Sequence, residues 1–485
     1  MKKFICLFLC VLCVNFSAGC AKNNAVLSEY DIALTLNNDM TVDGQMTLNY
    51  VNDTKYKLEN LEFMLYPNAF SKGAEIKPIY LEYFDQAYES GLSYGGIEIN
   101  EVKVDNKAAN FTVKNGKSSV LSVSLFSELK SGQSVQIFID FSLTLPCVNH
   151  RFGYGKNTVN LTGFYPILCP YENGKYYESI YYPSGDPFYS NVANYKVSLT
   201  VPSEYIIASS MSATFVETLQ NFTTYSYKRD SVREVAFILS KNFNVVKSSE
   251  NGTQITYYYF NDNLAETSLV AAKYALLYFS KKYGKYPYDE YVFCEADFIY
   301  GGMEYPCLTM IDKNLSGFDR AYTIVHETAH QWWYGLVGVN QNENAFIDEG
   351  LTEYSTVLFF DNHSEYGKGK KELLSYAYNA YVEMRKSLVK EQNPLPKMNV
   401  NLGEFTSDID YVSIAYYRAQ LMLYDLSSFM GEVRFNKFLK NLCSEYSYKN
   451  LTLTNFLHCA EKYKVGAKKF LLGYINGTTP LKYAC

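Results

Sequence analysis

The strongest constraint on the fold of this chain is a change in the spacing of its apolar residues near residue 250. From about residue 28 to residue 245, apolar and polar residues alternate in several runs, for example 32–36 and 195–201. This period of two is typical of strands with one buried and one wet face. From about residue 261 the apolar residues recur at helical spacing instead, first in 269–279. The pattern predicts an α+β multidomain chain, with an all-β domain followed by a mostly helical one.

Length and charge narrow the class further. A chain of 485 residues exceeds one ordinary core, and its apolar fraction of 48% is ample for packed domains. The formal net charge of −6 leaves no basic footprint, so nucleic acid is not an expected partner. We predict a signal segment over 1–19, a tether over 20–27, a β domain over 28–250 and a second domain over 251–485.

The N-terminus has the composition of an export signal. Two lysines follow Met1, an apolar run over 4–14 is too short to span a bilayer, and the small residues 17–19 precede Cys20. Small residues before a cysteine resemble a bacterial lipoprotein cleavage site, where the new terminal cysteine carries lipid. We therefore expect an exported protein anchored at Cys20 to the outer face of a bacterial membrane. The alternative is ordinary cleavage, an unmodified Cys20 and a secreted protein.

Cysteines indicate neither a disulfide framework nor a cysteine metal site. Three of the eleven lie in the predicted signal segment. No C-x-x-C pair remains among the others, and their spacings are wide.

A different metal-binding pattern occurs in the segment His326-Glu327-Thr328-Ala329-His330. Residues four apart lie on one face of a helix, so both imidazoles can reach one ion. Glu327 lies about 100° around the helix from His326 and can reach a water molecule on that ion. The motif therefore predicts two metal ligands and, in Glu327, a general base.

A third ligand is expected because catalytic zinc sites use three protein ligands and keep one open position. Glu349 follows His330 within a run of apolar residues at helical spacing, over 347–358, and so belongs to the next helix. We predict one Zn²⁺ per chain, bound by His326, His330 and Glu349. Glu353 either orients a ligand histidine or is a solvated helix charge.

These residues resemble the aminopeptidase N family of zinc metallopeptidases, which are gluzincins with a thermolysin-like catalytic domain. HExxH, eighteen residues and a glutamate is that family's ligand spacing. The segment Gly301-Gly302-Met303-Glu304-Tyr305 is similar to the family's Gly-x-Met-Glu-Asn, with tyrosine in place of asparagine. The resemblance implies that this strand edge, with Gly301, Gly302 and Met303, lies along the substrate. It also implies that Glu304 binds the free α-amine.

A third segment, 411–419, resembles the family's sequence ending in Tyr-x-Lys-Gly. The resemblance implies that Tyr416 donates a hydrogen bond to the oxyanion of the tetrahedral intermediate. Tyr411 matches a second tyrosine of that segment. Arg418 keeps the positive charge, and Ala419 replaces glycine.

The resemblance extends loosely to the β domain. Asp186-Pro187-Phe188 is similar to part of the family's saddle-like N-terminal domain, which often lends one polar residue to the amine site. Glu172 is the candidate for that role. The helical cap domain of the family is expected to be absent here, which implies a more open cleft.

The predicted function is a zinc-dependent aminopeptidase that hydrolyses N-terminal residues from peptides by attack of metal-activated water. Two alternatives stay open. The missing cap and Tyr305 are compatible with a zinc endopeptidase on the same scaffold. A non-catalytic surface-binding lipoprotein would have no need of Glu327. No oligomeric state is predicted.

Overall fold

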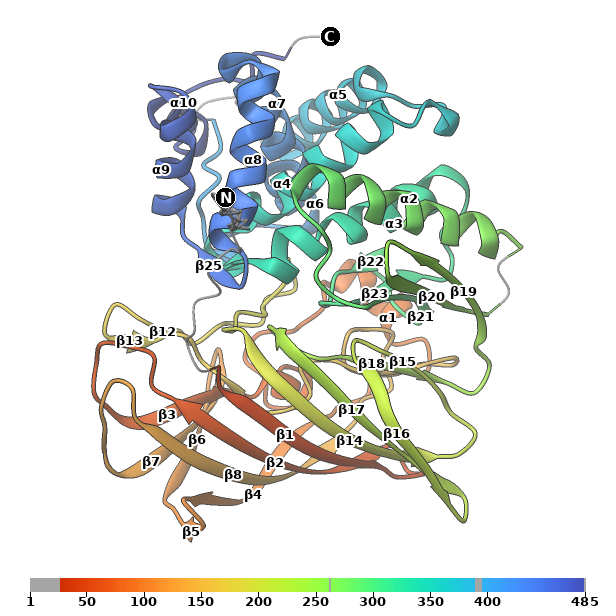
Figure 1. Ribbon diagram of the computed structural model, residues 1–485, viewed down its shortest axis with the longest axis vertical. Coiled ribbons are helices and arrows are strands. Elements are labelled where there is room, and N and C mark those ends of the chain that lie inside the picture. Colours follow the sequence, from red (N-terminus) through yellow and green to blue (C-terminus); the bar gives the residue numbers. More distant parts are fainter. Residues whose placement is uncertain (1–26, 261–262, 389–394, 484–485) are drawn as a thin grey trace, which may run out of the picture.

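The computed structural model describes residues 27–260, 263–388 and 395–483. The predicted signal segment, Cys20 and nearly all of the tether lie outside the described residues. The first half of the described chain is built of strands and the second half is mostly helical, with the two halves stacked on each other (Figure 1). The predicted α+β architecture is therefore confirmed.

The β domain is built around an eight-stranded sheet of order β16-β17-β14-β1-β2-β8-β4-β5. Most neighbours are antiparallel, but β1 and β14 run parallel, with Ile32 opposite Val197. The alternating apolar residues of β1 are buried, as their period of two predicts. The strands are β1 (Glu29–Leu36), β2 (Thr41–Val51), β4 (Gly96–Val104), β5 (Lys107–Ala108), β8 (Ser134–Thr144), β14 (Ala193–Pro202), β16 (Ser212–Leu219) and β17 (Phe222–Val232).

Smaller sheets complete this domain, and their buried residues belong to the same continuous core. One has the order β11-β3-β7-β6, another has the order β15-β18-β10-β9, and β12 and β13 form a hairpin. Their bounds are β3 (Leu58–Met64), β6 (Phe111–Asn115), β7 (Ser119–Leu129), β9 (Gly153–Tyr154), β10 (Val159–Leu161), β11 (Ile167–Leu168), β12 (Tyr171–Glu172), β13 (Lys175–Tyr176), β15 (Ile206–Ser209) and β18 (Phe237–Ser240). Three short helical pieces are η1 (Tyr66–Phe70), η2 (Leu81–Tyr83) and α1 (Phe84–Ala87).

The second half begins with a five-stranded sheet of order β19-β20-β21-β23-β22. Its strands are β19 (Asn244–Glu250), β20 (Thr253–Tyr259), β21 (Glu290–Ala296), β22 (Gly302–Met303) and β23 (Leu308–Asp312). Because β19 pairs with β20, the predicted boundary at residue 250 falls inside this hairpin. Helices α2 (Ala265–Tyr283) and α3 (Gly317–Ala329) pack on each other beside this sheet (Figure 1).

Helix α4 (Gln341–Asp361) is the centre of the helical region, because it is buried without interruption from Ala345 to Phe360. It packs against α3, α5 and α7. The surrounding elements are η3 (Gln331–Leu336), β24 (Val337–Val339), η4 (Ser364–Tyr366), α5 (Lys370–Leu388), η5 (Leu402–Glu404), α6 (Asp408–Tyr411), η6 (Val412–Arg418), α7 (Ala419–Met430), α8 (Glu432–Tyr446), β25 (Lys449–Leu451), α9 (Leu453–Tyr463) and α10 (Ala467–Ile475). None of the helices in the described part of the chain has the length and apolarity that a bilayer crossing requires.

A buried carboxylate joins the two halves just before the edge strand β22. Asp297 is 1% exposed and accepts hydrogen bonds from the backbone and side chain of Asn157 and from the backbone of Thr158, all in the β domain. It also forms an ion pair with Lys313. Charge-assisted bonds of this kind are strong when buried. They fix the segment that leads to Gly301 against the β domain.

Candidate active site and metal centre

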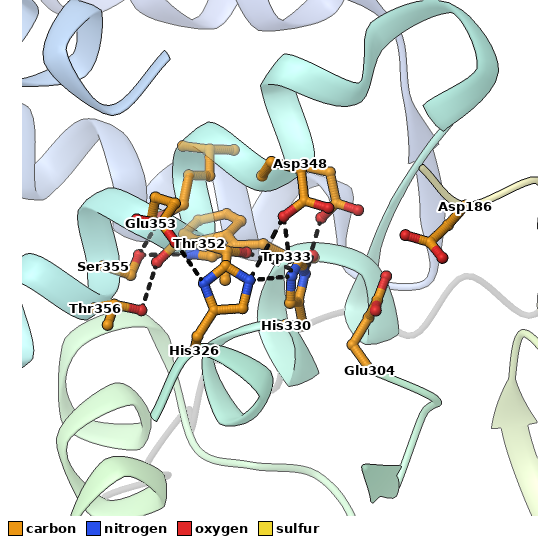
Figure 2. A network of polar contacts seen from close by, with 12 residues as sticks. Asp186, Glu304, His326, His330, Trp333, Asp348, Thr352, Glu353, Ser355 and Thr356 are labelled. Carbon is orange, nitrogen blue, oxygen red and sulfur yellow. Dashed lines mark hydrogen bonds and ion pairs between the residues drawn. The ribbon is translucent and has the colours of Figure 1, made fainter. Parts of the chain in front are cut away.

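The three predicted metal ligands converge from two helices. His326 and His330 lie at the end of α3 and Glu349 lies in α4, and all three side chains are buried. The two Nε2 atoms are 3.1 Å apart, and Glu349 Oε2 lies 3.5 Å from each of them. The close-up in Figure 2 shows both imidazole rings turned toward α4.

The spacing of these donors fits a zinc ion. Bond lengths of about 2.0–2.1 Å place the ligand atoms of a tetrahedral zinc site about 3.3 Å from one another. Glu349 Oε2 is buried and has no hydrogen-bond donor among the described residues. An oxygen of this kind is costly to bury unless a cation compensates it. Two imidazoles and one carboxylate are also the donor types that zinc prefers.

A buried carboxylate supports each ligand histidine from behind. Glu353 Oε1 lies 3.0 Å from His326 Nδ1, and its Oε2 accepts hydrogen bonds from Tyr322 Oη at 2.6 Å and Gln420 Nε2 at 3.0 Å. Glu353 is 4% exposed. Of the two interpretations of its sequence position, the structure therefore agrees with an orienting residue and not with a solvated helix charge.

The second histidine has a similar support, which the sequence did not indicate. His330 Nδ1 lies 3.0 Å from the carbonyl oxygen of Trp333, 3.1 Å from Thr352 Oγ1 and 3.2 Å from Asp348 Oδ1. Asp348 is itself hydrogen-bonded to Gln341. These acceptors favour a proton on Nδ1, which leaves Nε2 free to bind a metal.

Glu327 projects from the same turn of α3 toward the strand edge. A Cβ atom at residue 302 would lie 2.1 Å from Glu327 Oε1, so only glycine at this position allows the close approach. Burial raises the pKa of the Glu327 carboxyl to about 8, against the opposing effect of the imidazoles of His326 and His330. Its Oε2 has no hydrogen-bond partner in the described chain. The carboxylate is therefore available to a water molecule or a substrate.

A cavity of about 380 Å³ lies over the metal donors. Tyr416 lines it, and its ring stacks on that of His326 with 6.0 Å between the centroids. Burial raises the pKa of the Tyr416 hydroxyl well above its ordinary value, and the charge of Glu349 raises it further. The hydroxyl is therefore protonated and able to donate. Tyr411 also lines the cavity, and its hydroxyl lies 3.4 Å from Glu349 Oε1.

The edge strand contributes some of its predicted residues to the cavity. Gly301, Gly302 and Glu304 line it, and Glu304 Oε1 accepts a hydrogen bond from Gln341 Nε2 at 3.3 Å. Burial raises the pKa of the Glu304 carboxyl. Met303 is not part of the lining, because its sulfur faces the β domain, 3.1 Å from Arg151 Nε.

The β domain lends the cavity a carboxylate other than the predicted one. Glu172 lies in β12 and accepts a hydrogen bond from the Tyr189 hydroxyl, outside the cavity lining. Asp186 lines the cavity instead, pairs with Arg151 and is turned toward Glu304 (Figure 2). The segment that carries Asp186 was singled out in the sequence, but this side chain was not.

Two charged residues of the helical region, Arg418 and Asp408, lie differently with respect to the cavity. Arg418 is fully buried and donates to the carbonyl oxygens of Tyr474 and Thr479, so it holds the end of α10 and does not reach the cavity. Asp408, which the sequence analysis missed, lines the cavity and accepts a hydrogen bond from Tyr83 Oη at 2.8 Å.

The comparison with protein families agrees with this geometry. Residues 268–472 match the model of the peptidase family M1 domain. Together with the donor set above, this domain confirms the prediction of a metallopeptidase with zinc as its cofactor.

Curated relatives of the M1 domain match parts of the chain. Human aminopeptidase B is 30% identical over 209 residues, which are 41% of this chain and 31% of that protein. Leukotriene A-4 hydrolase of Xenopus laevis is 25% identical over 401 residues, 78% of this chain and 62% of that protein. The chain thus spans about a third of the length of aminopeptidase B.

Solved structures share the fold over nearly the whole chain. An M1 zinc metallopeptidase from Deinococcus radiodurans superposes with a TM-score of 0.68 and covers 95% of this chain and 96% of its own. Its sequence identity is 16%, so this likeness concerns the fold alone.

The two supporting carboxylates generate a prediction. Glu353→Gln and Asp348→Asn each weaken zinc binding by about 10–100-fold, because each removes the charge that holds a ligand imidazole in place. Competition with a chromophoric chelator measures this affinity. The matched control is Glu343→Gln, an exposed glutamate on the same helix α4, which leaves the affinity unchanged. Zinc affinity equal to that of the wild type in both variants would exclude an orienting role.

Proposed function

We propose that the protein is a zinc aminopeptidase that removes N-terminal residues from peptides. The observation that carries this proposal is the position of Glu304, a buried carboxylate in the same cavity as His326, His330 and Glu349. A peptide N-terminus brings an ammonium group that can pair with it. An internal peptide bond offers no such charge, so the pairing favours exopeptidase action.

The remaining residues have separate roles in this reaction. A zinc ion held by His326, His330 and Glu349 would acidify water and polarise a substrate carbonyl. Glu327 accepts the proton of the attacking water and then delivers it to the departing amine. Tyr416 donates its hydroxyl proton in a hydrogen bond to the developing oxyanion. Gly302 allows the substrate edge and Glu327 to approach each other.

The names and bound ligands of similar proteins support peptides as the substrate class. Human aminopeptidase B is an aminopeptidase by name. A glutamate-to-alanine mutant of the Deinococcus radiodurans enzyme has been crystallised with a Tyr-Ser-Ala substrate, and such a mutant of a two-domain M1 zinc metallopeptidase has been crystallised with L-arginine. Short peptides and single amino acids are also the size that a cavity of about 380 Å³ accommodates.

The proposed base predicts a defined loss of activity. Glu327→Gln lowers kcat by about 10²–10⁴-fold, because the amide cannot take up a proton, while bound zinc stays at one per chain. Aminoacyl chromogenic substrates and metal analysis measure the two quantities. Full activity in this variant contradicts the mechanism. Stoichiometric zinc without turnover in the wild-type protein contradicts catalysis and supports a binding protein.

Substrates blocked at the α-amine distinguish exopeptidase from endopeptidase action. Nα-acetylated substrates are cleaved far more slowly than free ones by the wild type, and Glu304→Gln narrows the difference. Internal cuts in a peptide digest read by mass spectrometry, with no single-residue ladder, would establish an endopeptidase instead.

The cavity also suggests which N-terminal side chain is preferred. Asp408, at the start of α6, is held by Tyr83, whose ring meets that of Tyr300 edge-on at 5.6 Å between centroids. All three residues line the cavity. A carboxylate beside two aromatic rings suits a guanidinium or ammonium group through charge-assisted hydrogen bonds and cation–π contacts. We infer a preference for N-terminal arginine or lysine.

This preference predicts a substrate-specific effect. Asp408→Asn lowers kcat/KM for arginyl and lysyl substrates about tenfold, which corresponds to one charge-assisted hydrogen bond of ~1.4 kcal/mol, and leaves alanyl and leucyl substrates within about twofold. The control Asp319→Asn removes one exposed charge on α3 and changes neither class. An equal loss for all substrates would show that Asp408 does not select the side chain.

For the location of the protein, we propose export and attachment to the outer face of a bacterial membrane through lipid on Cys20. The basis is the positive, apolar and small-residue order of residues 1–20. Labelling with a fatty-acid probe is expected in the wild type and not in Cys20→Ala, which is recovered in soluble form. An unlabelled wild-type protein, processed after residue 19, would instead be secreted.

A further inference from the structure

Tyr334, four residues after the ligand His330, has a strained backbone. Its φ is 147° and its ψ is −64°, inside the irregular turn η3. A φ of this value is rare in residues other than glycine, and it persists only where the surrounding structure holds the backbone in place. Tyr334 is nevertheless 3% exposed, with its ring fully inside the protein. The strain therefore requires an explanation in the contacts around it.

Two consecutive residues of the β domain hold Tyr334 at both ends. The hydroxyl of Tyr334 donates to Glu234 Oε1, and its carbonyl oxygen accepts from Arg233 Nε at 2.8 Å. Both residues lie between β17 and β18, and both are buried. Arg233 further donates to the carbonyl oxygens of Ser190 and Leu336.

Other close contacts leave this arginine little room to move. It donates at 2.5 Å to the side chain of Asn450 and to the carbonyl oxygen of Lys449. A Cβ at Gly338 would lie 2.1 Å from the guanidinium carbon. The β domain thus inserts a rigid side chain into the turn that follows the metal-binding helix.

The turn in question carries an acceptor for a metal ligand. The carbonyl of Trp333 belongs to the peptide plane between Trp333 and Tyr334, so the ψ of Trp333, which is 68°, and the φ of Tyr334 together determine where that oxygen points. In the observed conformation it lies 3.0 Å from His330 Nδ1. The backbone N–H of Gly335 also donates to the carbonyl oxygen of His330 at 2.9 Å. Asp348 Oδ1 lies 3.2 Å from the same Nδ1 and is held by Gln341, whereas the carbonyl of Trp333 is held by the backbone of the turn itself.

We propose that Glu234 and Tyr334 are positioning residues for the metal site. By holding Tyr334 in its strained conformation, the β domain keeps the Trp333 carbonyl on His330 Nδ1 and thereby keeps Nε2 directed at the ion. A glycine would adopt this backbone conformation without strain, but it has no side chain through which Glu234 could hold the turn. The hydroxyl of Tyr334 provides this connection through its hydrogen bond to Glu234. The proposal rests on the zinc site and is independent of which peptides are cleaved.

The test measures zinc affinity, not activity. Tyr334→Phe removes the donor hydroxyl and Glu234→Leu removes the acceptor oxygen, and each raises the Kd for zinc about tenfold in competition with a chromophoric chelator. The double variant shows about the same tenfold effect, because both changes break one hydrogen bond. The matched control is Tyr165→Phe, a buried tyrosine of the β domain whose hydroxyl contacts Tyr195. It leaves the Kd unchanged.

A second measurement separates positioning from general destabilisation. The unfolding midpoint of the metal-free Tyr334→Phe protein is expected to match that of metal-free Tyr165→Phe, while only the former binds zinc more weakly. Unchanged zinc affinity in Tyr334→Phe overturns the proposal, as does additive behaviour of the two changes. A protein that binds zinc normally but cleaves no peptide would contradict the proposed function alone.

Discussion

The structure depends on keeping several like charges buried around one cation site. Helix α4 alone carries Asp348, Glu349 and Glu353, all inside a segment without exposed residues. Buried carboxylates are costly unless they are paired or hydrogen-bonded. Here the two histidines of α3 and the ion that they bind with Glu349 provide that compensation. The packing of α3 against α4 is therefore a requirement of the chemistry as well as of the core.

The β domain forms one side of the candidate active site. Its Asp186 and Arg151 line the cavity from one side. Its Asn157 and Thr158 fix Asp297 and hence the segment leading to Gly301. Beyond the end of α3, Arg233 and Glu234 form hydrogen bonds with Tyr334 in the turn after His330. Hydrophobic burial alone would hold two domains together, but these directional contacts also determine their relative position at the site.

What the sequence could predict follows from the range of the interactions. The alternation of β1 and the i, i+4 pair of histidines are local patterns, and the fold and the convergence of the donors agree with them. Met303 was expected along the substrate, but successive residues of a strand face opposite sides. Gly302 and Glu304 therefore face the cavity, and Met303 faces Arg151.

Residues that reach the site through tertiary packing leave no local pattern in the sequence, so their roles could not be predicted. Asp186 and Asp408 are far from the HExxH segment in sequence and reach the cavity only through the packing of the domains. Asp348 precedes a predicted ligand directly, yet nothing in the sequence distinguished its side chain from a surface carboxylate. The boundary near residue 250 stays a prediction, and it lies within the β19–β20 hairpin. The alternation of β19 does not reveal which sheet the strand joins.

The composition of the cavity links metal and substrate. Among the described residues, its lining contains the carboxyl groups of Asp186, Glu304, Glu327, Glu349, Glu353 and Asp408, whereas Arg151 is the one arginine and there is no lysine. Such an excess of negative charge in a partly closed space is relieved by binding cations. Zinc relieves it at one end, and under the proposed function the α-ammonium group of a peptide relieves it beside Glu304. In the proposed reaction each cation lowers the repulsion among the carboxylates that surround the other. The proposed selection of a positively charged N-terminus therefore depends on the same carboxylates that bind the metal.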